Sequence, residues 1–219
     1  MTPPLKLAVL VSGRGSNLAA LLQAIDQGSC HARVSAVLAD RHNAPALELA
    51  RSRGIDTHVV AAKEYRERAD WDRELTAQIA TSAPDLVVLA GFMRLIGSAL
   101  LERYAGRIIN VHPALLPAFP GLDAPAQAVV ARVCISGCTV HVVDAGVDTG
   151  PVLAQAAVPV LPSDDASSLH ARIQRAEHAL LPAVVNAVAR GTLLLGTPPR
   201  YADASLAAGT NSLVWPPLL

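Results

Sequence analysis

The chain has 219 residues, of which 52% are hydrophobic and 16% are charged, so it can bury a large core and does not resemble a disordered protein. Its 18 Lys and Arg residues balance its 18 Asp and Glu residues, and aromatic residues make up only 3%. This neutral, aromatic-poor composition argues against a protein that binds nucleic acid. The length predicts one compact domain with a short appendage.

The N-terminal segment and the cysteines are typical of a cytoplasmic protein. The apolar run before Ser12 is too short for the core of a signal peptide, and no run in the chain is long enough to span a membrane. The three cysteines, Cys30, Cys134 and Cys138, make no disulfide framework. We expect them to be reduced core residues rather than zinc ligands.

Short apolar runs alternate with stretches of helical periodicity along the chain. Beginning with a strand, we expect strands and helices in alternation over residues 7–11, 18–28, 34–39, 44–53, 57–60, 65–81 and 85–91. Later in the chain we expect strands over 108–112 and 139–143, a helix over 126–132 between them, and a long helix over 166–190 with a bend at Pro182.

Buried strands that alternate with helices indicate an α/β fold, with a single doubly wound, mostly parallel sheet covered by helices on both faces. Ligands of such sheets bind at the carboxyl ends of the strands. We expect residues 1–190 to form this domain and residues 191–219 to form a final strand and an irregular tail.

A glycine-containing turn, Ser12 to Asn17, follows the first strand. Its glycines let the backbone approach an anion, and the start of the next helix offers free N–H groups. A dinucleotide fingerprint would need a third glycine where the chain has Leu18, and the ending of a P-loop is also missing. The turn therefore predicts a site for a terminal monophosphate, or else a purely structural turn.

Asn110 and His112 lie two residues apart at the end of a predicted strand, so both side chains point to the same face. A carboxamide and an imidazole in this arrangement could stabilise an oxyanion. The alternative is structural, with Asn110 satisfying backbone groups and His112 capping a turn.

The loop over residues 143–151 carries two Asp and two Gly residues directly after another strand. One of the carboxylates, Asp144 or Asp148, could orient and charge the imidazole of His112, although an ordinary surface turn has the same composition. The chain lacks the G-x-S-x-G elbow of a Ser-His-Asp hydrolase. It also lacks H-x-H and H-E-x-x-H, so we expect no metal site.

Five stretches of the chain together resemble the phosphoribosylglycinamide formyltransferases, which use 10-formyltetrahydrofolate in purine biosynthesis. These stretches are VLVSGRGSNL, PDLVVLAGFMRLI, YAGRIINVHPALLPAFPGL, SGCTVHVVDAGVDTGPV and ARIQRAEHALLP. They extend from about residue 7 to residue 185, and their occurrence together in this order is specific. The resemblance implies a phosphate-binding N-terminal half and a folate-binding, catalytic C-terminal half.

The resemblance also implies roles for individual residues. The catalytic residues would be Asn110, His112 and Asp148, and the phosphate of glycinamide ribonucleotide would be held by Gly15, Ser16 and Asn17. Gln174 and Glu177 would bind the same substrate; without the resemblance they would be a solvated pair on one helix face. The folate would contact Arg68, Met93, Arg94, Leu95, Ile96, Asn110, Asp144, Ala145, Gly146 and Val147, with Arg68 and Arg94 near its anionic end.

The implied reaction needs two small-molecule substrates, glycinamide ribonucleotide and the co-substrate 10-formyltetrahydrofolate, and no metal, nucleic acid or membrane; a homodimer stays open. Attack of the substrate amine on the formyl carbon gives a tetrahedral oxyanion. Asn110 and a protonated His112 would stabilise this charge, while Asp148 would favour the imidazolium and help to relay the proton.

Three alternatives share part of this pattern. A formyltetrahydrofolate hydrolase resembles the same domain but uses water as the acceptor and carries an additional N-terminal domain. A methionyl-tRNA formyltransferase has a related signature and an added basic C-terminal domain. A nucleotide-binding module without activity would need the glycine turn but would have no use for Asn110, His112 and Asp148.

Two positions depart from the pattern of the formyltransferases. The loop from Asp123 to Gln127 stands where His and basic residues are common, and Ala114 stands where Ser is common. Both departures concern substrate binding and leave the three catalytic residues unchanged.

Overall fold

A computed structural model describes residues 3–196, 199–202 and 214–215 of the chain. The chain divides into two compact units, residues 1–110 and 111–219. The boundary lies inside strand β5 (Ile108–His112), between Asn110 and Val111.

The first unit is built on parallel strands in the spatial order β5, β4, β1, β2, β3. Strand β1 lies between β2 and β4, and residues Leu7 to Val11 are completely buried in it. A strand covered on both faces must be apolar at every position, which explains its uninterrupted apolar run. The bounds of the strands are β1 Leu5–Val11, β2 Ala32–Ala39, β3 Asp56–Val59 and β4 Leu86–Leu89.

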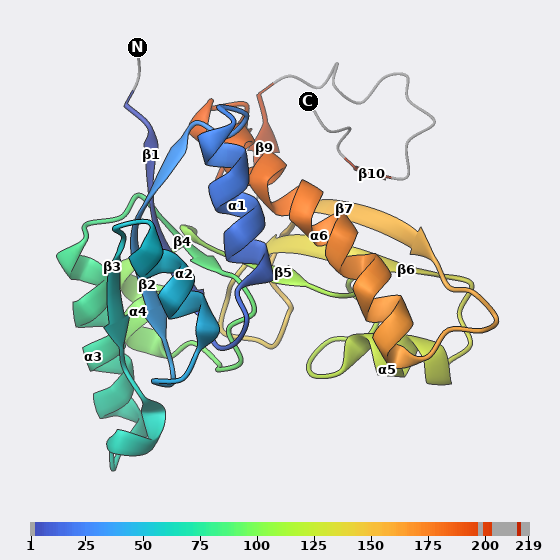
Figure 1. The fold of residues 1–219 in the computed structure, drawn as a ribbon, viewed down its shortest axis with the longest axis horizontal. Helices are drawn as coiled ribbons and strands as arrows, with labels where there is room; N and C mark the ends of the chain where they lie inside the picture. The colour runs from blue at the N-terminus through green and yellow to red at the C-terminus, as the bar shows by residue number, and fades with distance from the viewer. Residues whose placement is uncertain (1–2, 197–198, 203–213, 216–219) are drawn as a thin grey trace. The chain divides into compact units, whose positions relative to one another are not determined.

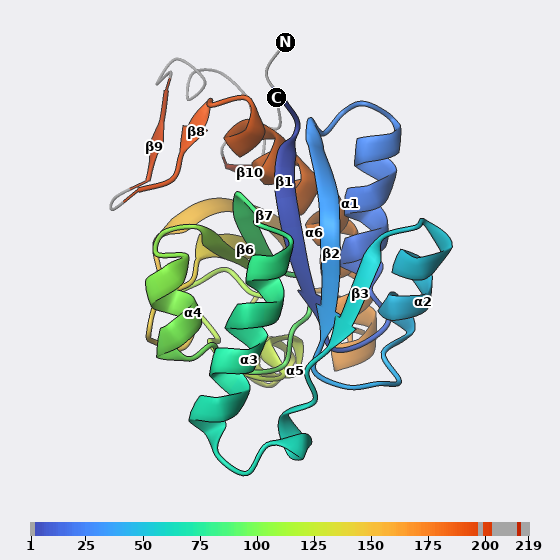
Figure 2. The same cartoon turned by 90° about the vertical axis from the view of Figure 1, so that its left-hand side faces the viewer.

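Helices cover both faces of this parallel sheet, with α1 and α2 on one face and α3 and α4 on the other (Figure 2). A short 3-10 turn precedes α3. The bounds of the helices are α1 Ser16–Asp26, α2 Pro45–Ser52, α3 Arg68–Thr81 and α4 Ser98–Arg103, and the 3-10 turn covers Ala62–Glu64. The predicted class, α/β with a doubly wound and mostly parallel sheet, is confirmed.

The second unit has two long antiparallel strands, β6 (Ile135–Val142) and β7 (Val152–Pro159). Helix α6 (Ala166–Ala189) packs on both strands, and the shorter α5 (Ala124–Val130) packs against α6 (Figure 1). A capping box starts α6: the Asp165 carboxylate accepts the N–H of Ser168 at 2.7 Å, and the Ser168 hydroxyl accepts the N–H of Asp165 at 3.0 Å. Such a cap satisfies two donors that the first helical turn leaves open.

Three two-residue strands complete the described part of this unit. β8 (Leu193–Leu194) pairs with β9 (Arg200–Tyr201), and β10 (Val214–Trp215) pairs with β7, both in antiparallel orientation. Part of the predicted tail, residues 191–219, lies outside the described residues, and the predicted domain boundary at residue 190 stays a prediction. Among the described residues, no helix has the length and hydropathy that a membrane crossing requires.

The elements predicted from the sequence are present, with ends shifted by a few residues. Helix α4, strand β7 and the 3-10 turn were missed, and three short strands stand where one final strand was expected. Helix α4 is only six residues long, too short for its periodicity to be visible. The sequence of β7 interrupts its apolar positions with Gln155 and is rich in Ala, so it lacks the pattern of a buried strand. The pairing of β6 and β7 is antiparallel, which the predicted, mostly parallel sheet allows.

One local expectation changes. Cys30 and Cys138 are buried but Cys134 is exposed, so the prediction of three core cysteines is wrong for Cys134. This residue comes just before β6, in the connection from α5, and a short connection of this kind lies at the surface. Helix α6 continues on both sides of Pro182, and the bend at this residue stays a prediction.

The close contact between β6 and β7 makes Gly137 a sensitive position. A Cβ atom added at Gly137 would lie 2.0 Å from the carbonyl oxygen of Ala156. Gly137→Ala should therefore lower the free energy of unfolding by roughly 1–3 kcal/mol, because the strands must move apart. Urea denaturation followed by circular dichroism measures this loss.

Gly13→Ala is the matched control, since a Cβ atom there meets nothing within 4 Å. Its stability should stay within about 0.5 kcal/mol of that of the wild type. Equal stability of the two variants would show that β6 and β7 do not approach this closely.

Candidate active site

The glycine turn predicted to bind phosphate lies between β1 and α1. Gly15 is the N-cap of α1 and has a left-handed backbone with φ 78°. A Cβ atom on Gly15 would also lie 2.6 Å from the Cβ atom of Ala46. Two independent constraints, the backbone angle and the contact with α2, therefore require glycine at this position.

The start of α1 suits an anion. Its first turn contains no acidic residue, and no side chain caps the N-terminus. The positive end of the helix dipole at this turn favours a phosphate. Of the other predicted phosphate ligands, Ser16 is half-buried and Asn17 is 7% exposed.

The predicted folate segment, Met93 to Ile96, follows β4 in the same unit. Met93 and Leu95 are large apolar residues and are each 61% exposed, which is typical of a surface that meets an apolar ligand. The Met93 N–H donates to the Ser12 hydroxyl at 2.8 Å, and the Ser12 N–H donates to the Gly91 carbonyl at 3.2 Å. These bonds attach the segment to the beginning of the phosphate turn.

Arg68 and Arg94, the two predicted partners of the folate's anionic end, both have protein partners. The Arg68 guanidinium donates to the Leu95 carbonyl and lies over the Trp71 ring, 4.8 Å from its centroid. The Nε atom of Arg94 donates to the Asp40 carboxylate at 3.0 Å. This contact between Asp40 and Arg94 was not predicted from the sequence.

In the second unit, the Asp148 carboxylate lies between two buried imidazoles. His112 Nδ1 is 3.3 Å from one carboxylate oxygen, and His141 Nε2 is 3.5 Å from the other. The Gly121 N–H donates to the same oxygen that faces His112, at 2.8 Å. The predicted pairing of His112 with Asp148 is present, while His141 was not predicted as a member of the site.

Both nitrogens of each imidazole face oxygen atoms. His112 Nε2 lies 2.8 Å from the carbonyl oxygen of Phe119, and His141 Nδ1 lies 2.9 Å from the carbonyl oxygen of Val142. Oxygen atoms on two sides therefore fix the orientation of each ring.

The loop that carries Asp148 is fixed by close backbone contacts. Asp148 has a left-handed backbone with φ 54°, and a Cβ atom on Gly150 would lie 1.8 Å from the Val142 carbonyl oxygen. Burial would raise the pKa of Asp148. The hydrogen bonds from His141 and Gly121 and the charges of the two imidazoles outweigh this, so the pKa lies below the ordinary value of 3.8.

The other predicted folate residues of this loop, Asp144 to Val147, are exposed. The Asp144 carboxylate accepts from the Gly146 N–H at 3.0 Å and from the Thr149 hydroxyl at 2.7 Å. Asp144 thus shapes the loop instead of joining the two imidazoles, and Asp148 is the carboxylate that contacts His112.

Gln174 and Glu177 lie three residues apart on α6. Gln174 is half-buried and Glu177 is only 4% exposed, so the alternative of a solvated pair is wrong for Glu177. Burial raises the pKa of the neighbouring Cys138 thiol to about 12, and the charge of Glu177 adds to this effect. A carboxylate at such a buried position needs hydrogen-bonding or charged partners, and the binding role of Glu177 stays a prediction.

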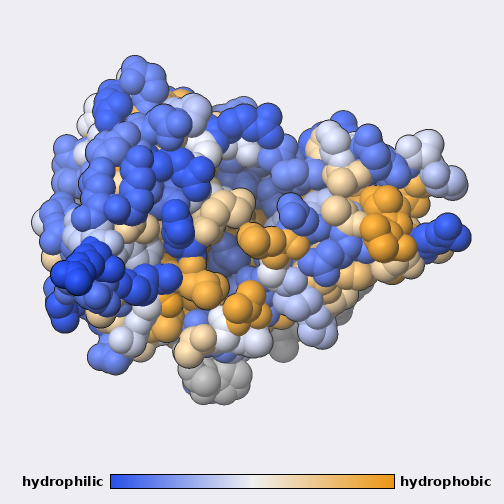
Figure 3. Space-filling view, turned by 90° about the horizontal axis from the view of Figure 1, so that it is seen from below, coloured by the Kyte–Doolittle hydropathy of each residue, from blue (hydrophilic) through white to orange (hydrophobic). Residues whose placement is uncertain are grey.

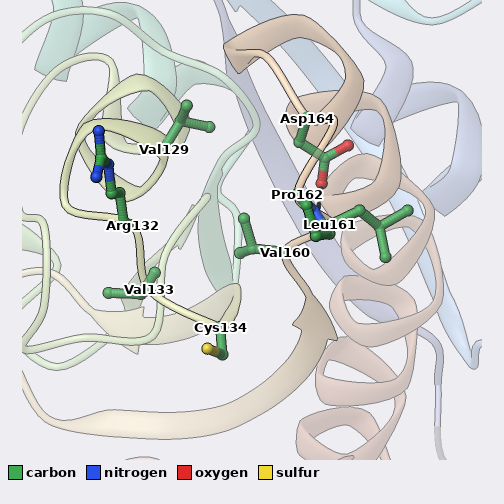
Figure 4. Close-up of a pocket in the computed structure, with 8 residues that line it drawn as sticks. All are labelled: Val129, Arg132, Val133, Cys134, Val160, Leu161, Pro162 and Asp164. Atoms are coloured by element: carbon green, nitrogen blue, oxygen red, sulfur yellow. Dashed lines mark hydrogen bonds between the residues drawn. The ribbon is translucent and has the colours of Figure 1, made fainter.

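A separate surface cavity of about 520 Å³ lies in the second unit, and none of the predicted site residues lines it (Figure 4). Its lining residues are Val129, Arg132, Val133, Cys134, Val160, Leu161, Pro162 and Asp164.

Figure 3 shows further apolar side chains exposed on one face of the molecule. Within the described ranges, no three His, Cys, Asp or Glu side chains are grouped as a metal ion would need.

Comparison with known proteins defines the class of the chain. Residues 5–185 match the Formyl transferase family, so the chain belongs to this family. It is 48% identical over 194 residues to the phosphoribosylglycinamide formyltransferase of Mycobacterium tuberculosis, covering 88% of this chain and 89% of that protein. It is also 43% identical to the trifunctional purine biosynthetic protein of Drosophila melanogaster, but spans only 14% of that longer protein.

Solved structures agree with this placement. Glycinamide ribonucleotide transformylase 1 from Symbiobacterium toebii superposes with a TM-score of 0.89 at 42% identity, over 93% of this chain and 96% of that one. A formyltetrahydrofolate deformylase from Pseudomonas syringae shares the fold, with a TM-score of 0.84 at 22% identity. The family predicted from the five sequence stretches, that of the phosphoribosylglycinamide formyltransferases, is confirmed.

The lowered pKa of Asp148 predicts how the stability of the protein depends on pH. Because the folded-state pKa is depressed, the stabilisation from this carboxylate is present above its unfolded-state value and is lost as pH falls through the folded-state value. Asp148→Asn should therefore be less stable than the wild type at pH 7. The difference should shrink as pH falls below about 4.

Urea denaturation at several pH values between 7 and 3 measures this difference. Asp56→Asn, which changes an exposed carboxylate at the start of β3, serves as the control and should match the wild type throughout. A stability difference for Asp148→Asn that does not change with pH would contradict the ion pairs described here.

Proposed function

We propose that the chain transfers the formyl group of 10-formyltetrahydrofolate to the primary amine of glycinamide ribonucleotide. The observation that carries this proposal is the contact of the Asp148 carboxylate, which is 13% exposed, with His112, two residues beyond Asn110 on one strand. A carboxamide, a charged imidazole and its counter-ion are the groups that formyl transfer through an oxyanion needs.

The reaction forms one C–N bond, breaks another and transfers one proton. The amine nitrogen attacks the formyl carbon, a C–N bond forms, and the electron pair of the carbonyl moves onto oxygen. The bond to N10 of the folate then breaks as the oxygen reforms its double bond. The amine loses a proton and N10 gains one, so the products are the formylated nucleotide and tetrahydrofolate.

Asn110 and His112 stabilise the oxyanion. Their side chains are on the same face of β5 because alternate residues of a strand point the same way. In the ligand-free protein, Nε2 of His112 faces the Phe119 carbonyl oxygen at 2.8 Å. The oxyanion takes the place of this carbonyl oxygen, while Nδ1 keeps its contact with Asp148.

Asp148 keeps the His112 imidazole charged and oriented. His141 and the Gly121 N–H hold the carboxylate from its other sides, so that it cannot turn away from His112. As a general acid, the imidazolium of His112 gives a proton to N10 as the bond to the folate breaks, and the ring then takes up the proton that the amine loses.

The remaining predicted residues bind the substrates. The start of α1, with Gly15, Ser16 and Asn17, receives the phosphate, and Gln174 and Glu177 of α6 bind the same nucleotide. The exposed apolar residues of the Met93 to Ile96 segment and the Asp144 to Val147 loop receive the folate, with Arg68 and Arg94 toward its anionic end. The cytoplasmic location, the homodimer and the absence of a metal stay predictions.

The function is tested by following tetrahydrofolate release from 10-formyltetrahydrofolate with and without glycinamide ribonucleotide. We expect release only when the nucleotide is present, in equal amount to the formylated product. The same assay distinguishes the alternative functions. Release without the nucleotide would indicate a hydrolase, and no release in either reaction would indicate a binding module.

Asn110→Ala tests the oxyanion site. Loss of one donor to the oxyanion should lower kcat by roughly 10²- to 10³-fold with little change of KM, because the bond forms mainly in the transition state. Steady-state kinetics with each substrate varied in turn measures both constants.

Asn186→Ala, at the far end of α6, is the control for the loss of an amide and should keep the wild-type kcat. If Asn110→Ala raised KM and left kcat unchanged, Asn110 would contribute to ground-state binding, and the oxyanion role would be wrong.

A further inference from the structure

Asp40, at the end of β2, is a buried carboxylate with several strong partners. Its side chain has no exposed surface. Arg41 donates to both carboxylate oxygens at 3.2 Å, and Arg94 donates at 3.0 Å. Burial would raise the pKa of Asp40, but the hydrogen bonds from Arg41, Ser12 and Arg94 together hold it below the ordinary value.

Two of these partners belong to the predicted ligand-binding segments. Ser12 begins the phosphate turn, and Arg94 lies in the folate segment. The Ser12 hydroxyl bonds to Asp40 and accepts the Met93 N–H at 2.8 Å. The contacts therefore form a closed ring that runs from Asp40 to Ser12, to Met93, to Arg94 and back to Asp40.

The stability of the fold alone does not explain this ring of contacts. A buried charge is costly, and an apolar residue of similar size at a strand end usually supports a fold as well or better. The two arginines are themselves 46% and 44% exposed, so the buried member is the acceptor that they share. Charge-assisted hydrogen bonds to one fixed acceptor give definite directions to the groups that donate them.

We propose that Asp40 is a positioning residue for substrate binding, which fixes the phosphate turn and the folate segment in one geometry. Through Ser12 it sets the backbone at Met93, and through the Nε atom of Arg94 it directs the guanidinium. The inference rests on the proposed function, because it takes both segments as ligand-binding.

Asp40→Asn removes the charge and keeps the shape of the side chain. We expect KM to rise for both substrates, each by roughly tenfold, because bonds that order both segments weaken. The kcat value should stay within about threefold of that of the wild type, since the reacting groups are elsewhere. A purely structural role would instead reduce the active fraction, and therefore the apparent kcat, at unchanged KM.

Asp164→Asn is the matched control. Asp164 has a side chain only 3% exposed and pairs with Arg172 in the second unit. It lies in no predicted ligand segment, so this variant should keep both KM values. A rise of KM for one substrate only, for neither, or equally for Asp164→Asn would overturn the proposal.

Amide hydrogen exchange of the ligand-free protein tests the positioning without any activity. Asp40→Asn should speed exchange at the Met93 N–H and across residues 12–17 and 91–96, whereas Asp164→Asn should not. If Asp40→Asn fails to fold, Ser12→Ala removes the acceptor of the Met93 N–H and should speed exchange at the same places. Unchanged exchange in the variant that folds would overturn the proposal.

The proposed function and the positioning role of Asp40 can be refuted independently of each other. Absence of formyl transfer by the wild type would contradict the proposed function. In that case, amide exchange alone decides whether Asp40 fixes the two segments.

Discussion

A carboxylate that loses most of its contact with water on folding must be met by enough donors and positive charge to replace that water. The site in the second unit depends on how Asp148 satisfies this requirement. Its two oxygens face His112 and His141, and one of them also accepts the Gly121 N–H. The same contacts that keep Asp148 ionised hold the imidazole of His112 in place, so stability and catalysis rely on one set of bonds.

The need to bring donors to the Asp148 carboxylate is reflected in the backbone conformation around it. The residue itself has a positive φ, and the backbone at Gly150 approaches the Val142 carbonyl so closely that a side chain would not fit. Such conformations are costly and persist where surrounding contacts fix them. Asp40 shows the same solution in the first unit, where two arginines and a serine take the place of the imidazoles and the amide.

The sequence was sufficient to predict the elements that have a strong local pattern. The apolar run of β1 and the glycines after it predicted the strand, the turn and the start of α1 correctly, because buried parallel strands and helix N-termini have strong local signatures. Asn110, His112 and Asp148 could be singled out for a similar reason: they follow or end predicted strands. Their assigned roles came from the joint resemblance of five stretches, since each stretch alone left alternatives open.

What the sequence could not predict depends on contacts between distant residues. His141 is the last residue but one of β6, and only the structure shows that its ring reaches Asp148. The partnership of Asp40 with Arg94 joins residues 54 positions apart. Strand β7 lacked an apolar pattern of its own, and its place was decided by pairing with β6, which is a tertiary effect.

The three cysteines differ in reactivity, and this makes the protein suitable for labelling at one position. Burial raises the pKa of Cys30 to about 11 and that of Cys138 to about 12, so neither forms the nucleophilic thiolate at neutral pH. Cys134 is exposed at the mouth of the cavity between α5 and the β7–α6 connection. A maleimide dye or a nitroxide would therefore attach at Cys134 in the natural sequence, giving a spectroscopic reporter outside the predicted active site without any engineered residue.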